Sequence, residues 1–477
     1  MKIYLLSAIL LLGFFLRAQE TLSGNFLFLK DQGRDMLAVK SVVVDKKPTL
    51  IGPYTGFRGV FQGPLYYYIL ALPFVVSGGD PRGVMWLMLT ASMLSIPFGY
   101  IVGKKFFSET TGLFTAFLFA VSPAAGAAAT FIWSPFFIFP LVSAWLYFFL
   151  DWVSSFSKKS FVIMVSFLGL MFHFETAFAA PFTLTIFIFC YFLARKNKHS
   201  FSVLLFFVIL AIFLSPLLLF DFRHDHITLK SIVSILQGMD VGLGGGEPYG
   251  KIVRDHIIRF ILNLKATFIA QDLVANIFSF VFLFSAVYYM IAGLSKKIKL
   301  LVLIPLVLFT IYLFFPYQIW DWYVIGLFPI YLLLGGIFLT NRRWRLMSMI
   351  VVIVLLSNAY VKLDNLYRYP DHGGTAKLRG KLEAIDAVYK DANGQPFSLE
   401  VFTPVVLTDA YDYLIWWYGL KKYSYTPEDR GMLYLLIESD PSKPWSYNGW
   451  IETEIKIGST IDTYELPSGF IIQKRKI

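Results

Sequence analysis

Two aspartates in the first polar loop have a spacing that could serve chemistry. Asp31 and Asp35 lie four residues apart in the loop 18–63, which follows an apolar first segment. If this stretch is helical, both carboxylates project from one face with Arg34 beside them. A carboxylate held there could deprotonate an acceptor hydroxyl or amine, or help to bind a divalent cation. A solvated helix face just outside a membrane would show the same spacing.

The second long loop, 221–272, carries basic side chains that could bind a phosphate. They are Arg223, His224, Arg254 and Arg259, the last two within a stretch that predicts an amphipathic interfacial helix. Arginine suits phosphate because its planar fork donates two parallel hydrogen bonds and stays charged. We therefore expect Arg223 and Arg254 to be the main phosphate ligands, with His224 and Arg259 next. Contact with anionic lipid headgroups is the alternative.

His173 and Glu175 lie between two apolar stretches, at the expected outer boundary of a membrane. Ionisable groups near membrane depth are usually paired, face a cavity and are functional. These two side chains could therefore contact a sugar or an acceptor. Pairing with each other or with water is the alternative.

No metal site can be assigned from ligand spacing. The histidines of the second loop follow no fixed ligand geometry, and Cys190 is the only cysteine, which excludes an internal disulfide and a cysteine-rich metal site. The cofactor is therefore unknown, and a divalent cation near the aspartates is possible.

The elements that must position these residues are membrane spans. The chain is 57% hydrophobic and 15% charged, whereas soluble domains average about 25% charged residues. Uncharged runs long enough to cross a bilayer, about 20 residues each, recur along the chain. The net charge of +11 lies largely in short basic loops after every second span, as the positive-inside rule requires of cytoplasmic loops. This placement excludes nucleic acid as the reason for the charge.

With the amino terminus inside, this alternation predicts about eleven spans and an outward carboxyl end. The spans are expected near 3–16, 83–103, 110–128, 132–150, 160–175, 176–194, 200–220, 273–294, 300–318, 322–340 and 346–361. The first is predicted to be a retained span, because a signal-peptide cleavage site is poorly formed after it. The apolar segment 64–79 is short for a span, so we expect a re-entrant or interfacial helix there.

The composition divides the chain into a membrane domain, 1–361, and a soluble domain, 362–477. Helices are expected at 375–391 and 408–420, and strands at 397–403, 432–438, 451–457 and 469–473. The predicted fold is thus an α-helical polytopic membrane protein with a small C-terminal α/β or α+β domain outside the membrane.

The sequence resembles a known family at several of these points. Asp31, the segment Gly63-Pro64-Leu65-Tyr66-Tyr67-Tyr68, the apolar stretch after it and the multi-span body are similar to the GT-C glycosyltransferases. The nearest branch holds the protein mannosyltransferases and the lipid A aminoarabinose transferases, and is glycosyltransferase family 39-like. That branch has Pro-Pro-Leu-Tyr-Tyr where this chain has Gly63 in place of the first proline. It also has an adjacent Asp-Glu pair, whereas Asp31 is followed by Gln32. The likeness is best within residues 1–200.

The resemblance implies a GT-C fold and roles for particular residues. Asp31 would be the base for the attacking nucleophile, and Asp35 a weaker candidate for orienting or metal-binding work. Gln62 and Tyr66 gain weight as substrate-binding residues. Enzymes of this kind take a sugar from a polyprenyl phosphate or diphosphate and invert the anomeric carbon.

The predicted function is transfer of a hexosyl or pentosyl group from a polyprenyl-phosphate donor to a lipid, glycan or protein acceptor. The protein would be integral to the plasma (inner) membrane, with its active site and C-terminal domain extracytoplasmic and no nucleic-acid partner. A transporter or flippase for lipid-linked sugars is the alternative, but it would need ionisable residues along a path through the bilayer. A scaffold with a binding tail is a third reading, in which Asp31 would be dispensable.

Overall fold

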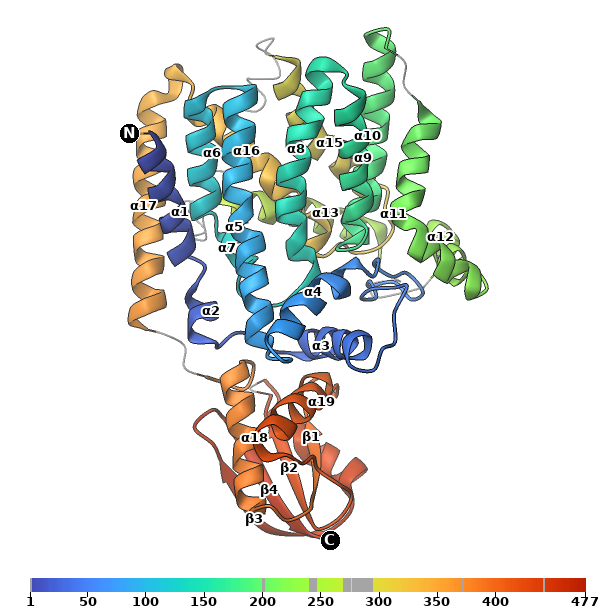
Figure 1. Cartoon of the computed structure of the whole chain (residues 1–477), viewed down its shortest axis with the longest axis vertical. Coiled ribbons are helices and arrows are strands. Elements are labelled where there is room, and N and C mark those ends of the chain that lie inside the picture. Colours follow the sequence, from blue (N-terminus) through green and yellow to red (C-terminus); the bar gives the residue numbers. More distant parts are fainter. Residues whose placement is uncertain are drawn as a thin grey trace.

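The computed structural model describes residues 2–199, 202–239, 247–268, 276, 295–369, 373–440 and 442–477. The first part of the chain is a helical bundle (Figure 1). Its helices are α1 (Lys2–Phe15), α2 (Gln19–Ser23), α3 (Lys30–Val43), α4 (Leu65–Val76), α5 (Pro81–Phe106), α6 (Glu109–Val121), α7 (Pro123–Ala127), α8 (Ile138–Ser155), α9 (Lys158–Met171), α10 (Thr176–Lys196), α11 (Val203–Arg223), α12 (Ile227–Leu236), α13 (Tyr249–Phe268), α15 (Lys296–Leu313), α16 (Leu327–Leu339) and α17 (Arg345–Arg368). Single 3-10 turns at Ser134–Phe137, Asp321–Val324 and Arg342–Trp344 precede α8, α16 and α17.

Five helical segments are long and apolar enough to cross a membrane, by length and composition, among the residues that the structure describes. They are Pro81–Phe106, Ser134–Ser155, Thr176–Lys196, Val203–Arg223 and Arg342–Arg368. Shorter apolar helices include Ile3–Phe15, Glu109–Val121 and Leu327–Leu339. The expected span 273–294 lies outside the described residues, so the total of about eleven spans stays a prediction.

The basic loops gather at one end of the bundle. The ammonium of Lys105 lies 2.9 Å from a carboxylate oxygen of Asp151, at the end of α8. Lys296 and Lys297, which begin α15, lie over the rings of Phe156 and Phe106, at 5.0 and 5.2 Å from the ring centres. The opposite end holds α3 and α4 (Figure 1). The positive charges are therefore separated from the first loop along the length of the bundle.

The helix α4 is too short to cross a bilayer. It spans 12 residues, whereas a crossing needs about 20. It lies beside α3 at the end of the bundle away from the basic loops (Figure 1). Its tyrosines Tyr66 and Tyr67 are buried, while Leu72 and Val76 are exposed. An interfacial or re-entrant helix, as expected from the sequence, has this length and position.

The C-terminal residues fold around a mixed four-stranded sheet of order β1-β2-β4-β3. The strands are β1 (Phe397–Phe402), β2 (Met432–Glu438), β3 (Ser459–Glu465) and β4 (Phe470–Lys476), and the helical segments are α18 (Leu378–Ala392), α19 (Asp409–Leu414), a π-helical turn (Ile415–Gly419), α20 (Leu420–Tyr423), α21 (Ser446–Trp450) and a second π-helical turn (Ile451–Ile455). β1 and β2 are parallel, and the other two pairs are antiparallel. Three of the four expected strands thus coincide with observed ones.

The expected strand at 451–457 is wrong. Residues Ile451–Ile455 form a π-helical turn, and the strand begins only at Ser459. Apolar residues at 451 and 455 fit a helical face as well as an alternating strand. Ile455 is buried against Phe402 and Leu433, so the helical option places it on the apolar face of the sheet.

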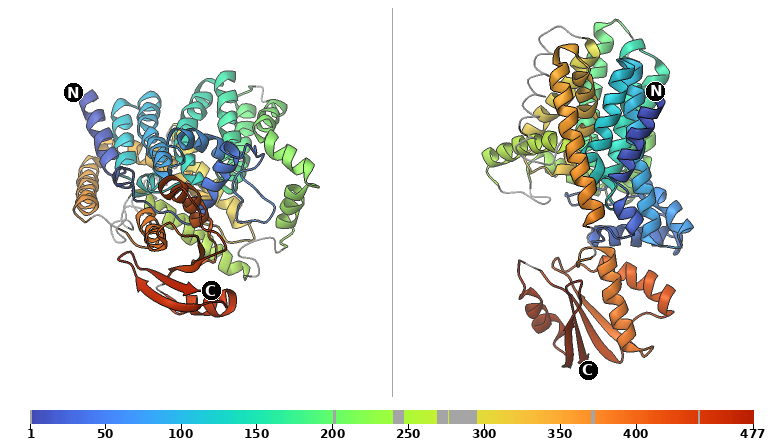
Figure 2. Two further views of the ribbon diagram at one scale, coloured as in Figure 1. Left: turned by 60° about the horizontal axis from the view of Figure 1, so that its bottom comes forward. Right: turned by 90° about the vertical axis from the view of Figure 1, so that its left-hand side faces the viewer.

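The C-terminal domain is docked on the first loop of the bundle (Figure 2). The amide of Leu378 donates to the carbonyl of Phe26, and the amide of Phe28 donates to that of Ala376, at 2.9 and 3.0 Å. The indole of Trp417 donates to the carbonyl of Gly78 at 3.1 Å. The side chain of Tyr413 donates to the neighbouring carbonyl, of Gly79. The domain is therefore held to both α3 and α4 rather than hanging from a single linker.

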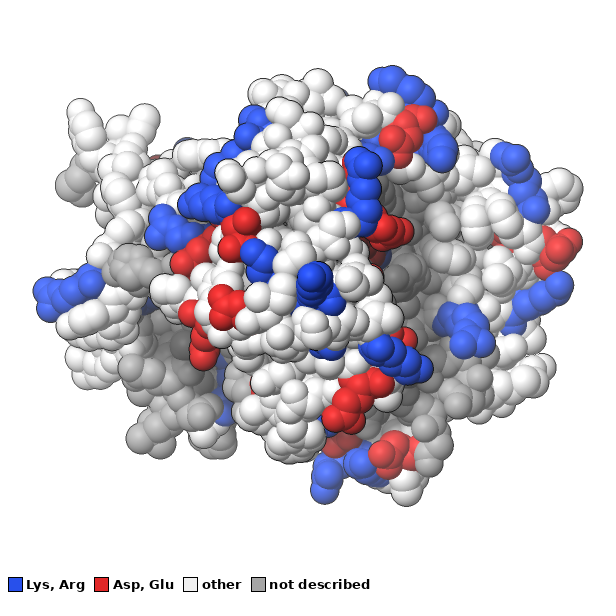
Figure 3. All heavy atoms as spheres, turned by 90° about the horizontal axis from the view of Figure 1, so that it is seen from below, with Lys and Arg blue, Asp and Glu red and all other residues white. Residues whose placement is uncertain are grey.

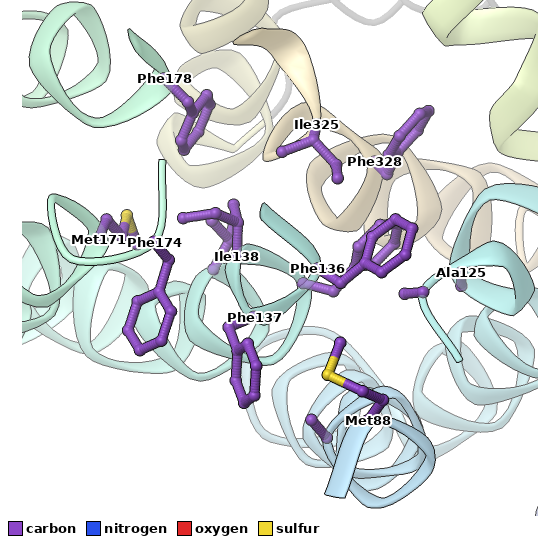
Figure 4. Packing of buried hydrophobic residues seen from close by; sticks show 14 of the residues in the cluster. Met88, Ala125, Phe136, Phe137, Ile138, Met171, Phe174, Phe178, Ile325 and Phe328 are labelled. Carbon is purple, nitrogen blue, oxygen red and sulfur yellow. The ribbon is translucent and has the colours of Figure 1, made fainter. Parts of the chain in front are cut away.

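Aromatic side chains pack against one another in the core of the bundle, and Figure 4 shows several of them. Phe137 and Phe174 stack with ring centres 5.1 Å apart, and Phe139 and Phe328 stack at 5.4 Å. Stacked rings of this kind each remove a large apolar area from solvent and prefer defined geometries. These contacts fix the start of α8 against the segment before α10 and against α16.

Candidate functional site

A cavity of about 610 Å³ opens between the end of the bundle and the C-terminal domain. Its walls come from the start of α3, the turns at 53–56, 131–135 and 320–323, and three segments of the C-terminal domain. Asp31, Gln62 and Glu175, all predicted as site residues, line this cavity. The structure therefore brings together residues that are 144 positions apart in the sequence.

The helix predicted around the two aspartates is present as α3. Arg34 lies between them: its guanidinium is 2.9 Å from a carboxylate oxygen of Asp31 and 2.8 Å from one of Asp35. The two acids nevertheless have different surroundings. The Asp31 side chain is 41% exposed and lines the cavity, whereas that of Asp35 is 0% exposed. Only Asp31 can therefore meet a substrate.

The buried carboxylate of Asp35 holds the guanidinium of Arg34 in place. Besides its two bonds from Arg34, it accepts hydrogen bonds from the hydroxyls of Tyr66 (3.1 Å) and Tyr67 (3.5 Å) on α4. Burial raises the pKa of Asp35 to about 6, against the opposing effect of Arg34. Burial lowers the pKa of Arg34, but the two carboxylates outweigh it and leave that pKa raised. Arg34 thus stays charged beside Asp31.

We expect this buried carboxyl to give the protein a measurable pH dependence. The pKa of Asp35 is higher in the folded protein than its ordinary 3.8, so the folded state binds more protons between pH 4 and 6. The contribution of Asp35 to stability therefore falls as pH rises through this window. On going from pH 7 to pH 5, the free energy of unfolding of the wild type should rise by about 1 kcal/mol relative to that of Asp35→Asn. Thermal denaturation in detergent at both pH values measures this, and a constant gap between the two proteins would contradict the assignment.

A second polar group lines the cavity around Gln62. Its amide oxygen accepts from the hydroxyl of Ser134 at 2.7 Å, and its amide nitrogen donates to Glu175 at 3.4 Å. Glu175 also caps α10 by accepting from the amide of Ala177 at 3.1 Å. Gln32, on α3, donates to the carbonyl of Ile132 at 2.9 Å. These bonds tie the first loop to the turn at 131–135 and to the start of α10.

His173 lies behind the cavity wall and explains the departure at Gly63 from the family pattern. Its Nδ1 accepts from the amide of Leu65 at 3.3 Å, so Nε2 carries the proton and donates to the carbonyl of Phe213 at 2.9 Å. A Cβ on Gly63 would overlap the ring of His173. No side chain, and hence no proline, fits at position 63 while this histidine is in place.

Aromatic side chains cover much of the remaining wall. Trp320 and Trp322 stack with ring centres 5.3 Å apart, and the edge of Trp133 meets Trp322 at the same separation. Tyr54 lies under the guanidinium of Arg34, with 5.1 Å between its ring centre and the Arg34 Cζ. All three tryptophans line the cavity.

A second, mostly apolar cavity of about 520 Å³ adjoins the first. The two cavities share Trp133 and Trp322 as lining residues. Its apolar lining includes Phe136, Phe139, Leu262, Ile325 and Phe328. Its polar lining residues are Asn263, Lys265 and Asp321, and Asp321 is bound by Arg259 at 2.8 Å. This arrangement places two cations beside an apolar space.

The other predicted phosphate ligands lie elsewhere. Arg223, at the end of α11, and His224 are exposed, and the ring of His224 bonds to the carbonyl of Phe220. The Arg254 side chain is 69% exposed and lies 3.8 Å from Asp255. None of these three residues lines either cavity. Their role with a phosphate stays a prediction.

Within the described ranges, no group of three or more His, Cys, Asp or Glu side chains is placed to hold a metal ion. The two first-loop aspartates share Arg34 between them instead.

No motif or spacing in the sequence predicts the part of the cavity that the C-terminal domain forms. Lys381, Thr403, Tyr411 and Glu438 all line it. They come from three separate elements and a loop, with no motif that relates them to the first loop. Only the docking of the domain onto α3 brings them to the site.

Comparison with known proteins bears on this geometry. A family model described as dolichyl-phosphate-mannose-protein mannosyltransferase matches residues 62–220. That stretch begins at Gln62, in the cavity wall, and ends in the last turn of α11. A comparison with curated protein sequences found no significant match.

Several solved structures share the fold. ArnT from Cupriavidus metallidurans bound to undecaprenyl phosphate is 11% identical, with 99% of this chain and 97% of that chain covered and a TM-score of 0.62. The apo form of the same protein is 13% identical, with the same coverage of both chains and a TM-score of 0.60. The archaeal oligosaccharyltransferase AglB from Archaeoglobus fulgidus, in complex with an inhibitory peptide and a dolichol-phosphate, is 13% identical. The match covers 100% of this chain and 74% of that chain, with a TM-score of 0.53. The resemblance to GT-C membrane glycosyltransferases is thereby confirmed, at the level of fold.

Proposed function

We propose that this GT-C-fold membrane protein transfers a sugar from a polyprenyl-phosphate donor to an acceptor, using Asp31 as the base. The observation that carries this proposal is the position of Asp31. Its partly exposed carboxylate is fixed by Arg34 in a cavity that meets an apolar cavity on one side and the C-terminal domain on the other. Such a place lets a lipid-bound donor and a soluble group on an acceptor meet at one carboxylate.

The proposed reaction is a single displacement. The acceptor oxygen or nitrogen attacks the anomeric carbon while the bond from that carbon to the phosphate oxygen breaks, so the configuration inverts and polyprenyl phosphate leaves. Asp31 accepts the proton that the attacking group loses. Arg34 holds Asp31 in place, and Asp35 fixes Arg34 through two further hydrogen bonds. The transferred group is proposed to be a hexosyl or pentosyl unit.

The donor is proposed to enter through the apolar cavity. Its lipid would contact Phe136, Phe139 and Phe328, and its phosphate would lie near Lys265 and Arg259 where the two cavities share Trp133 and Trp322. The leaving phosphate would then face the cavity that holds Asp31.

We expect substitution of the individual basic residues to lower the affinity for the donor by different amounts. Losing a hydrogen bond to a charged group costs about 1.5 to 3 kcal/mol, so Arg259→Met and Lys265→Met should each weaken undecaprenyl phosphate binding by roughly 10- to 100-fold. Arg223→Met and Arg254→Met should have smaller effects if these exposed arginines act only at the membrane surface, and similar effects if they bind the phosphate. Tryptophan fluorescence can follow the titration, because Trp133 and Trp322 line both cavities. Unchanged affinity in all four variants would contradict a cationic donor site.

The site is proposed to face outward from the plasma (inner) membrane, with the C-terminal domain on the same side. The basic loops at the other end of the bundle support this orientation. In intact cells, a membrane-impermeant thiol reagent should label Gln395→Cys but not Lys158→Cys, both positions being exposed. The native Cys190 is buried and should give little background. Labelling at position 158 from outside would overturn the orientation.

The test of the function is turnover in detergent. A purified transferase should release polyprenyl phosphate from a lipid-linked sugar when acceptor from the cell envelope is added, without sealed vesicles. A transporter has no second compartment in detergent and should release none. Movement of the sugar lipid across vesicle membranes without release of polyprenyl phosphate would overturn the transferase proposal in favour of transport.

A further inference from the structure

One wall of the cavity is a closed triangle of polar side chains from the C-terminal domain. Lys381 on α18 donates to Glu438, the last residue of β2, at 2.8 Å and to the hydroxyl of Tyr411 on α19 at 2.9 Å. That hydroxyl donates in turn to Glu438 at 2.7 Å. All three side chains line the same cavity as Asp31.

Stability does not account for this triangle. The Lys381 side chain is 1% exposed and that of Glu438 is 10% exposed. Burying such a pair costs desolvation, and packed apolar residues of similar volume often give equal or greater stability. Burial lowers the pKa of Lys381, and Glu438 opposes this effect. A buried ion pair that opens onto a cavity is better explained by what the cavity binds.

The ionisable side chains that line the cavity are of both signs. They are Lys30, Arg34 and Lys381 on one hand and Asp31, Glu175 and Glu438 on the other, and Glu175 is only 2% exposed and hydrogen-bonded to Gln62. On the face of the molecule shown in Figure 3, basic and acidic side chains also lie interspersed rather than in one large patch of either sign. This distribution provides no strong field for a highly charged acceptor.

The triangle has unused hydrogen-bonding capacity of both kinds. An ammonium has three donors and a carboxylate about four acceptor positions, more than the internal bonds of the triangle use. Neighbouring hydroxyls of one ligand could therefore accept from Lys381 and donate to Glu438. The stacked rings of Trp320 and Trp322 line the same cavity and offer flat apolar surface there.

The position of this wall relative to Asp31 is fixed by the docking of the domain. Gly33 on α3 packs directly against the backbone of Asp409 and Ala410, next to Tyr411. Lys381 follows closely after Leu378, whose amide is bonded to Phe26. The base and the triangle are thus held by contacts between the same two segments.

We propose that the acceptor is a neutral, polyhydroxylated group, a sugar or the sugar end of a glycan, and that Lys381 and Glu438 bind its hydroxyls while Asp31 takes the proton of the attacking one. The role of this ligand as the acceptor rests on the proposed function, in which the apolar cavity binds the lipid donor. The ligand class itself follows from the triangle and the aromatic rings. Lys381 and Glu438 are therefore specificity-determining residues of the cavity.

Binding of simple probes to the full chain in detergent tests the proposal. Saturation-transfer NMR would be recorded with methyl glycosides of glucose, galactose and mannose, and with sn-glycerol 3-phosphate as an anionic probe. We expect at least one neutral glycoside to bind, and its affinity to fall at least tenfold in the double variant Lys381→Met/Glu438→Gln, which leaves no buried charge unpaired. Binding of none of the glycosides, preference for the anionic probe, or unchanged binding in the double variant would overturn the inference.

The chain offers a matched control on the same domain. Lys474, Asp391 and Tyr434 form a similar cluster, with the ammonium 2.6 Å from the carboxylate, and none of them lines the cavity. Lys474→Met/Asp391→Asn should leave glycoside binding unchanged. If the main double variant does not fold, Tyr411→Phe removes only one hydroxyl and should weaken binding several-fold; unchanged binding there would count against the proposal. Wild-type protein that binds glycosides but not undecaprenyl phosphate would refute the proposed function and leave the ligand class of the triangle standing.

Discussion

Replacing Asp31 by asparagine should lower the rate of sugar transfer by about 10² to 10⁴-fold, the usual contribution of a general base. The amide is nearly the same size and its oxygen can still accept from Arg34, so the fold of α3 should persist. The amide cannot accept the proton of the attacking group. Donor affinity should change little, because the proposed phosphate site lies beside the apolar cavity. Transfer and undecaprenyl phosphate binding measured on the same preparation separate these two effects.

Asp45→Asn is the matched control for this variant. Asp45 follows the end of α3 and is paired with Lys40 at 3.1 Å, but it does not line the cavity. The pair is partly exposed, and exposed pairs contribute about 1 kcal/mol or less. The control should therefore retain activity and stability. Turnover by Asp31→Asn close to that of Asp45→Asn would remove Asp31 from the role of base.

Replacing Gly33 by alanine should detach the C-terminal domain from α3. A Cβ at this position would overlap the backbone of Asp409 and Ala410, which cannot move away as a flexible side chain could. Overpacking usually costs about 1 to 3 kcal/mol, and here the strain falls on a docking surface. We expect faster hydrogen exchange at the amides of Phe28 and Leu378, which bond across that surface, and a large loss of transfer.

The same change at Gly250 provides the comparison. Gly250 lies in the first turn of α13, and among the described residues nothing outside its own stretch of helix lies within 4 Å of the place where its Cβ would be. Alanine is favoured over glycine in a helix by roughly 1 kcal/mol, so Gly250→Ala should be neutral or stabilising. Opposite signs for the two substitutions would confirm that the close approach at Gly33 is the cause. Normal activity and exchange in Gly33→Ala would show that the domain need not be docked for function.

Periodicity and composition in the sequence were sufficient to predict several features. The spacing of Asp31, Arg34 and Asp35 predicted a shared helix face, because residues three and four apart are neighbours on a helix. The uncharged runs predicted where long apolar helices lie, and β-branched and aromatic runs predicted β1, β2 and β4. The motif at 63–68 led to the GT-C fold. These are local properties, which are carried by neighbouring residues along the chain.

Only the tertiary structure decided which residues form the site. Asp31 and Asp35 are the same residue type on the same face, but the tyrosines of α4 bury only Asp35 and leave Asp31 in the cavity. The apolar residues at 451 and 455 fit both a strand and a helix, and the structure shows a helical turn that packs Ile455 on the apolar face of the sheet. Lys381, Tyr411 and Glu438 meet because the C-terminal domain folds, and they line the cavity of Asp31 because that domain is docked on α3. Such contacts depend on packing between distant segments, and no spacing along the chain encodes them.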